Sequence, residues 1–161
     1  MGRVVSLDEL VRLVAGFRCN KESVALANGC FDLLHVGHVR YLQGAKLEAD
    51  RLVVAVNDDS SVTAIKGAGR PILPVSARAE LVSALLVVDA VVIFSGLTVN
   101  DVLRAIRPNV HCKGTDYTVE TVPERETVLA YGGRTAIVGD PKGHSTRDLL
   151  ARIKQGVDEI D

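Results

Sequence analysis

Two histidines, three residues apart, are the side chains in this sequence best suited to chemistry. His35 and His38 flank Gly37 and follow an apolar run that ends in Asn28-Gly29. At the start of a helix, free backbone N–H groups and the positive end of the helix dipole favour a phosphate. Residues three apart share one helix face, so both imidazoles could donate to one phosphate. The pattern predicts phosphate chemistry at a strand-to-helix turn.

Two other interpretations of the histidine pair remain. A histidine is often purely structural, and two histidines at this spacing could form half of a metal site. A zinc site needs at least a third protein ligand, and no other His or Cys is suitably spaced. Placement between a strand and a helix therefore favours phosphate binding, and we assign no metal-ligating residue.

Other polar segments also follow predicted strands, at 57–59, 113–117 and 139–146. The carboxyl ends of parallel strands meet at one edge of a sheet, where ligands bind in α/β proteins. We therefore expect these segments to converge with the histidine turn. Segment 64–74 is basic and loop-like, which is typical of a mobile flap.

The elements that would position these residues alternate between strands and helices. Short β-branched runs predict five strands, at 24–27, 52–56, 90–94, 109–112 and 135–138. Helical spacing of apolar residues predicts helices at 7–17, 36–49, 77–86, 99–106 and 146–154, with another beginning near Pro123. This order predicts a Rossmann-like α/β fold, with a five-stranded parallel sheet and helices on both faces.

Length and composition favour a single domain. A chain of 161 residues can bury one core, which we divide into an N-terminal helical extension (1–22) and a catalytic domain (23–161). The 19 basic and 20 acidic residues nearly cancel, which predicts neither a nucleic acid nor a membrane as partner. No signal peptide and no apolar run of roughly 18 residues is present, so we expect a cytoplasmic protein. Three cysteines without CxxC spacing predict no disulfide.

Common nucleotide-binding motifs are missing from the sequence. Gly67-Ala68-Gly69 lacks the third glycine of the dinucleotide fingerprint, and no segment reads GxxxxGK[ST]. Neither a Rossmann dehydrogenase nor a P-loop enzyme fits.

Segment NGCFDLLHVGH (28–38) resembles the HxGH signature of the cytidylyltransferase-like nucleotidyltransferases. The resemblance runs from about Ala25 to Ile153 through RLVVAVNDD (51–59), IKGAGRPILP (65–74), ARAELVSAL (77–85), VDAVVIF (88–94), CKGTDY (112–117) and GHSTRDLLARI (143–153). Within that superfamily, the combination of NGCFD, KGxxRP and KGxDY is most similar to the D-glycero-β-D-manno-heptose 1-phosphate adenylyltransferases.

The resemblance implies an activity and partners. ATP and D-glycero-β-D-manno-heptose 1-phosphate would give ADP-heptose and pyrophosphate, by in-line attack on the α-phosphate, for bacterial lipopolysaccharide. Mg²⁺ would accompany the triphosphate, and a homodimer is expected.

The resemblance also assigns roles to particular residues. The catalytic residues would be His35, His38 and Lys66. Nucleotide binding would involve Asn28, Gly29, Cys30, Phe31, Gly37, Lys113, Gly114, Asp116, Ser145 and Thr146. Substrate binding would involve Asp32, Asp58 and Arg70.

Several of these residues have a simpler interpretation. Lys66 and Arg70 could be merely solvated, and Asp58 could only cap the next helix. Asp116 could pack its loop, and Ser145 could be an ordinary N-cap. Lys46 could contact phosphate or be a solvated helix lysine.

Departures from the family patterns define the rivals. Arg147 stands where the family commonly has a second Thr, and an acidic-Thr-Pro run is replaced at 96–100. Glycerol-3-phosphate cytidylyltransferases carry Arg-Thr-Glu-Gly where this chain has Asp140-Pro141-Lys142-Gly143. That enzyme, an FAD synthetase of the same superfamily and a noncatalytic nucleotide-binding module remain as alternatives.

Overall fold

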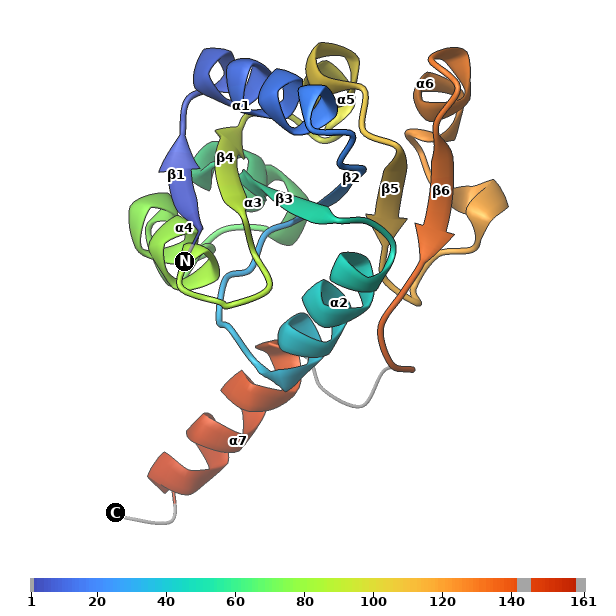
Figure 1. Cartoon of the computed structure of the whole chain (residues 1–161). Coiled ribbons are helices and arrows are strands. Elements are labelled where there is room, and N and C mark those ends of the chain that lie inside the picture. Colours follow the sequence, from blue (N-terminus) through green and yellow to red (C-terminus); the bar gives the residue numbers. More distant parts are fainter. Residues whose placement is uncertain (1, 142–145, 159–161) are drawn as a thin grey trace.

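The computed structural model describes residues 2–141 and 146–158, which contain one parallel sheet of six strands (Figure 1). The strands are β1 (Arg3–Val5), β2 (Val24–Gly29), β3 (Arg51–Asn57), β4 (Ala90–Phe94), β5 (Val110–Lys113) and β6 (Arg134–Ile137). Their spatial order is β1-β4-β3-β2-β5-β6. Figure 1 shows the strand direction turning steadily across the sheet, from β6 pointing down to β1 pointing up, as the right-handed twist of strands requires.

Helices cover both faces of the sheet. They are α1 (Leu7–Cys19), α2 (Val36–Leu47), α3 (Asp59–Lys66), α4 (Val75–Ser83), α5 (Asn100–Ile106), α6 (Arg125–Ala130) and α7 (Thr146–Asp158), with a 3-10 turn η1 (Val119–Thr121). One core layer joins α2 and α4 to the sheet through Leu42, Ala45, Ala79 and Val82. The other joins α1, α5 and α6 to it through Leu10, Val14, Leu103 and Val128. The predicted α/β fold, a parallel sheet with helices on both faces, is confirmed.

The prediction of five strands was wrong by one. β1 has only three residues, too few for any periodicity to show in the sequence. It forms because Arg3, Val4 and Val5 pair in register with Ala90, Val91 and Val92 of β4. A strand this short is stabilised by its neighbour, because its own residues supply few contacts.

The first 22 residues contribute to the same sheet and core. β1 extends the sheet beyond β4, and α1 buries Leu10 and Val14 against it. The predicted N-cap of α1 is confirmed: Ser6 Oγ accepts from the Glu9 amide, and the Glu9 carboxylate accepts from the Ser6 amide at 2.8 Å.

Three helix predictions differ in detail from the structure. Residues 59–66 form α3, although segment 64–74 reads as a loop; Asp58 provides the N-cap by accepting from the Ser61 amide at 2.8 Å. α4 begins at Val75, after Pro74, and α6 begins at Arg125, because η1 precedes it. α7 extends away from the sheet beyond α2 (Figure 1). Among the described residues, no helix is long and apolar enough to cross a membrane.

Candidate active site

The chain order reverses between β2 and β5, and these strands separate at their carboxyl ends. Their pairing stops at Ala27 and Cys112. Just beyond, the Tyr41 hydroxyl of α2 donates to the Cys112 carbonyl at 2.7 Å and lies 3.3 Å from the Asn28 amide. A crevice at such a switch point is where open α/β sheets bind ligands. β2 leads directly from this point into the histidine turn.

The two histidines begin α2, as predicted. His35 is the N-cap, and its carbonyl accepts from the amides of His38 and Val39 at 2.9 and 3.3 Å. The imidazole rings stack with their centroids 3.8 Å apart, at 24° to one another. Because the rings are nearly parallel, their edges can serve one group at the start of the helix, where the dipole favours an anion.

The ring of His38 is neutral at pH 7. Burial lowers its pKa to about 4, and electrostatic interactions with His35 and Lys66 act in the same direction, against a hydrogen bond with the Leu33 carbonyl. The His35 amide donates to His38 Nδ1 at 3.4 Å, so the proton of the neutral ring is on Nε2. His38 is therefore a neutral N–H donor in the absence of a bound anion.

The aromatic ring of Phe31 packs against the imidazole of His38. Its ring is buried, with its centroid 5.2 Å from that of His38 and 6.5 Å from that of Tyr41. Its backbone has φ of +48°, which is strained for a bulky side chain and recurs at functional sites. A Cβ on Gly29 would lie 3.2 Å from the Phe31 ring, so glycine leaves room for the ring. Burial raises the pKa of Cys30, so its thiol is protonated at neutral pH.

Asp32 and Arg70 form a buried ion pair that ties the 67–74 loop to the histidine turn. Asp32 is fully buried, and Arg70 Nε donates to its Oδ2 at 2.5 Å. The amides of Ile72 and Leu73 donate to Oδ1 at 2.7 and 3.1 Å. Burial alone would raise the pKa of Asp32, but the bonds from Leu73, Arg70 and Ile72 outweigh it and hold that pKa below its usual value. Arg70 is thus committed to a protein carboxylate.

Asp58 and Lys66 lie at the two ends of α3. The Asp58 carboxylate accepts from Ser60, Ser61 and Ser95, bonds that outweigh burial and bring its pKa to about 2. These contacts correspond to the capping alternative for Asp58. Lys66 is exposed, and its charge is near enough to depress the pKa of His38.

Lys113 and Asn28 meet in a buried polar network. Lys113 Nζ lies 3.4 Å from both Glu124 Oε2 and Asn28 Oδ1, and 4.9 Å from the centre of the Tyr117 ring. Asn28 Oδ1 also lies 3.0 Å from His111 Nε2. The network fixes the Asn28 side chain at the end of β2, with the Lys113 ammonium directed into the protein.

The remaining predicted residues are distributed around the same edge. Gly37 lies in the first turn of α2, and Gly114 and Asp116 lie in the turn after β5, where Asp116 is exposed. Thr146 is buried at the first position of α7, while Ser145 lies outside the described residues.

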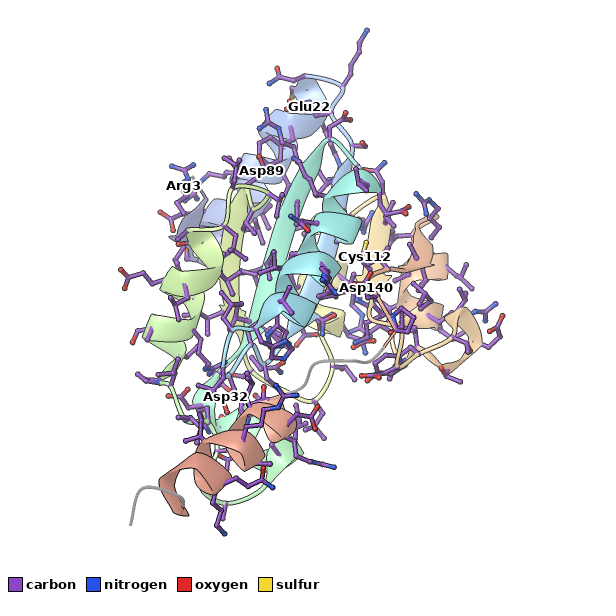
Figure 2. All side chains as sticks on the ribbon, turned by 90° about the horizontal axis from the view of Figure 1, so that it is seen from below. Arg3, Glu22, Asp32, Asp89, Cys112 and Asp140 are labelled. Atoms are coloured by element: carbon purple, nitrogen blue, oxygen red, sulfur yellow. The ribbon has the colours of Figure 1, made fainter. Side chains whose placement is uncertain are left out.

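Lys46 has a structural role. Its Nζ lies 2.8 Å from Asp89 Oδ2 and 2.5 Å from the Asp50 carbonyl. Asp89 lies well apart from Asp32 in Figure 2, on the side toward Glu22. The alternative of a phosphate contact for Lys46 is therefore not supported.

Sequence reasoning missed three buried polar residues of this edge: Arg78, His111 and Glu124. Each stands within or next to an apolar stretch of the sequence. Arg78 could have been recognised because it is a charged residue on the apolar face of a predicted helix. His111 and Glu124 carry no comparable signal, because strand and loop positions do not show where a side chain points.

His111 gives the protein an acid-sensitive element. Burial, with the charge of Lys113, lowers the pKa of His111 to about 3, whereas the unfolded chain takes up that proton near pH 6.5. Between these values the unfolded state binds more protons, so the stability contributed by neutral His111 is present above pH 6.5 and falls with acidification. From pH 7.0 to 5.5 we expect His111 to account for a loss of about 1 kcal/mol in the free energy of unfolding.

Urea unfolding of the wild type and His111→Gln at both pH values tests this expectation. The difference between pH 7.0 and 5.5 should shrink by about 1 kcal/mol in the variant, whatever its absolute stability. Equal losses in the two proteins would contradict it.

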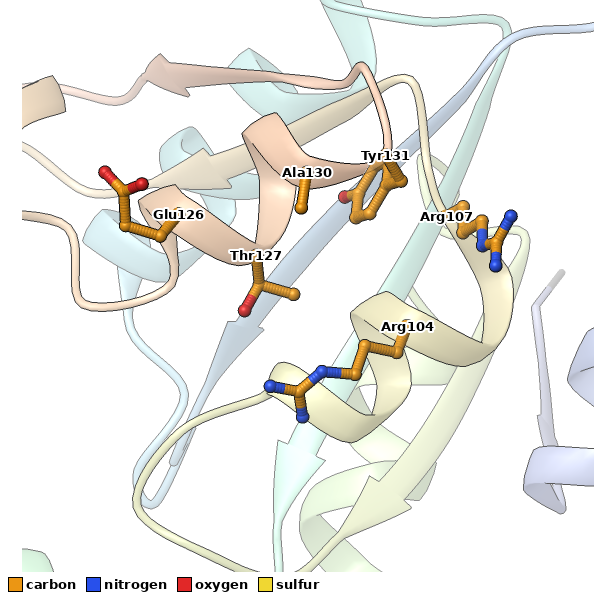
Figure 3. Close-up of a pocket in the computed structure, with 6 residues that line it drawn as sticks. All are labelled: Arg104, Arg107, Glu126, Thr127, Ala130 and Tyr131. Atoms are coloured by element: carbon orange, nitrogen blue, oxygen red, sulfur yellow. The ribbon is translucent and has the colours of Figure 1, made fainter.

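A surface pocket lies away from this edge, between α5 and α6 (Figure 3). Its lining consists of Arg104, Arg107, Glu126, Thr127, Ala130 and Tyr131. Arg107 and Tyr131 come shortly before β5 and β6, so the pocket lies near the amino ends of these strands. None of its residues belongs to the predicted site. Within the described parts of the chain, no group of three or more His, Cys, Asp or Glu is placed to hold a metal ion.

Comparison with known proteins assigns the family. The cytidylyltransferase-like family model matches residues 26–154. The bifunctional protein HldE of Caulobacter sp. (strain K31) is 44% identical over 151 residues, which are 94% of this chain and 31% of the relative. HldE of Alkalilimnicola ehrlichii is 44% identical over 155 residues, 96% of this chain and 32% of the relative. This chain thus spans about a third of the length of these relatives.

Solved structures agree with the fold. A lipopolysaccharide core biosynthesis protein from Thermoplasma volcanium superposes with a TM-score of 0.64 at 27% identity, over 75% of this chain and 99% of the other. Pantoate-β-alanine ligase from Francisella tularensis gives a TM-score of 0.64 at 13% identity, over 93% of this chain and 73% of the other, which speaks to the fold alone. With its paired histidines at the switch point and a family match over most of its length, the chain belongs to the cytidylyltransferase-like family.

Proposed function

We propose that this chain is an adenylyltransferase that transfers AMP from ATP to D-glycero-β-D-manno-heptose 1-phosphate. The observation that carries the proposal is the stacked pair His35 and His38 at the start of α2, which follows β2 at the switch point between β2 and β5. The pair offers N–H donors, and Lys66 offers a positive charge, to a phosphate at a helix N-terminus.

The reaction in this proposal is a direct displacement. A phosphate oxygen of the sugar forms a bond to the α-phosphorus while the bond from that phosphorus to the bridging oxygen breaks, and pyrophosphate leaves with that oxygen. The protein aligns the reactants and stabilises the charge on the phosphoryl oxygens. His38 would donate through Nε2, and the protonated thiol of Cys30 is unsuited to act as a nucleophile.

Mg²⁺ is proposed as the cofactor, carried by the triphosphate. Three carboxylates near the carboxyl edge already have protein partners: Asp32 binds Arg70, Asp58 binds serines, and Asp59 binds Arg78. They do not form a protein cage for the ion, and Mg²⁺ is commonly held largely by substrate phosphates.

The acceptor is inferred from relatives and from the motif combination. The HldE proteins match 94–96% of this chain, and the Thermoplasma volcanium protein is named for lipopolysaccharide core biosynthesis. The second name supports a role in lipopolysaccharide synthesis. An ADP-heptose product, made in the cytoplasm, is proposed from the motif resemblance. A homodimer is part of the proposal, again from the family resemblance. Nucleic acids are not proposed as partners, because acidic and basic residues nearly balance.

Roles for the remaining residues are also proposed. Asn28, Gly29, Cys30, Phe31 and Gly37 would form one wall of the nucleotide site. Lys113, Gly114, Asp116, Ser145 and Thr146 would form the other. Asp32, Asp58 and Arg70 would lie on the side of the site that binds the sugar phosphate. Asp32 and Arg70 would act there by fixing the 67–74 loop.

Pyrophosphate release with each nucleoside triphosphate tests the proposal. The acceptors to compare are heptose 1-phosphate, glycerol 3-phosphate and FMN. We expect turnover only with ATP and heptose 1-phosphate. Pyrophosphate release with CTP and glycerol 3-phosphate, or with ATP and FMN, would support the proposed displacement mechanism but would identify a different pair of substrates. Nucleotide binding without release in any combination would indicate a noncatalytic module.

A further inference from the structure

Arg78 is fully buried in α4, where it shares the inward face with Ala79 and Val82. Its guanidinium makes four hydrogen bonds, which reach three segments of the carboxyl edge: the histidine turn, the end of the Arg70 loop, and residues 57–59. These run from Nε to the Leu73 carbonyl (3.0 Å), from one terminal nitrogen to the carbonyls of Cys30 (2.6 Å) and Asn57 (2.8 Å), and from the other to Asp59 Oδ1 (2.7 Å).

The four partners come from segments that carry predicted site residues. Cys30 belongs to the turn that leads to the two histidines. Leu73 lies in the loop that contains Arg70, and its amide donates to Asp32 Oδ1. Asp59 is the first residue of α3, whose last residue is Lys66. Arg78 therefore links the histidine turn, the Arg70 loop and the Lys66 helix through one rigid group.

The burial of Arg78 is costly, and stability alone does not account for it. A guanidinium removed from water loses its hydration, and its single carboxylate partner, Asp59, has a side chain that is 48% exposed. Three of the four bonds go to backbone carbonyls, which an apolar side chain could not satisfy. A lysine could not replace the fork, because one ammonium cannot reach carbonyls on three sides with the same geometry. The bonds fix the relative positions of the segments.

We propose that Arg78 is a positioning residue for nucleotidyl transfer. It holds the Arg70 loop and the Lys66 helix in register with the histidine turn, and it does not itself touch the substrate. This inference rests on the proposed function, because it assigns the aligned segments to one reaction site.

The test compares Arg78→Lys with a control that lowers the melting temperature equally at a distance from the site. Val14→Ala or Leu10→Ala in α1, buried on the opposite face of the sheet, supplies that control. The first readout is hydrogen exchange at the Ile72 and Leu73 amides, which bond to Asp32, relative to the Val54 amide in β3. The second is kcat and KM for ATP in the pyrophosphate assay.

In Arg78→Lys we expect exchange at Ile72 and Leu73 to rise at least about 10-fold more than at Val54. We expect kcat to fall about 10- to 100-fold, more than KM rises, because misalignment affects the reacting geometry. The control should show a uniform rise in exchange and the kcat of the wild type.

Two results would overturn the proposal. One is a uniform rise in exchange in Arg78→Lys, as in the control. The other is a local rise at Ile72 and Leu73 with the kcat of the control. A wild type that is inactive with every acceptor would refute the proposed function. The hydrogen-exchange measurement needs no substrate, so it would still show whether Arg78 holds the Arg70 loop.

Discussion

Replacing His38 with alanine is expected to reduce kcat by about 100-fold or more, equivalent to about 3 kcal/mol of transition-state stabilisation. The neutral ring of His38 is oriented by the hydrogen bond from the His35 amide to Nδ1 and by packing against the Phe31 ring, so Nε2–H is a preorganised donor. Such a donor acts mainly on charge that develops during transfer, so KM for ATP should change much less than kcat. Steady-state pyrophosphate release measures both constants.

The matched control is Leu47→Ala, at the last position of the same helix, where the side chain is 88% exposed. It should leave both constants unchanged. His38→Gln, with an N–H donor of different geometry, should recover part of the lost rate. An alanine variant whose kcat stays within a few fold of the wild type would refute the catalytic role of His38.

The Asp32→Ala variant is expected to lose about 3–5 kcal/mol of unfolding free energy, because it leaves the Arg70 guanidinium and two amides without their acceptor in a buried place. Asp32 is fully buried, and the side chain of Arg70 is 17% exposed. Urea unfolding at pH 7 gives the loss directly. The same variant should also release the 67–74 loop, so its kcat should fall as well.

Asp101→Ala is the control for Asp32→Ala. Its carboxylate is 93% exposed and lies 3.2 Å from Arg104, so the change should cost less than about 1 kcal/mol. Because the pKa of Asp32 is held below its usual value, its contribution is complete above the unfolded pKa near 3.9 and is lost as the pH falls through the lower folded pKa. The wild type and Asp32→Ala should therefore converge in stability in strong acid. Equal stability of the two proteins at pH 7 would contradict the ion pair's role.

The alternation of strands and helices could be predicted because buried parallel strands read as β-branched runs, such as Leu52 to Val56. Ser6 as an N-cap could be predicted because a cap acts on residues three positions away. β1 could not, since its three residues become a strand only through pairing with β4. α3 was hidden because its short sequence carries two serines and a threonine, which are weak helix formers.

For the candidate site, too, some features could be predicted from the sequence and others depend on the tertiary structure. The sequence by itself determined the histidine pair, its strand-to-helix placement and the family, since all three depend on residues close together in the chain. Only the tertiary structure decided which polar groups are committed to one another. Two ion pairs join residues more than ten positions apart in the chain: Asp32 with Arg70, and Lys113 with Glu124. The bonds from Arg78 to three backbone carbonyls depend on the direction in which its buried guanidinium points. Hydrogen bonding and burial act through space, so a charged residue that reads as available in the sequence can be fully engaged in the folded protein.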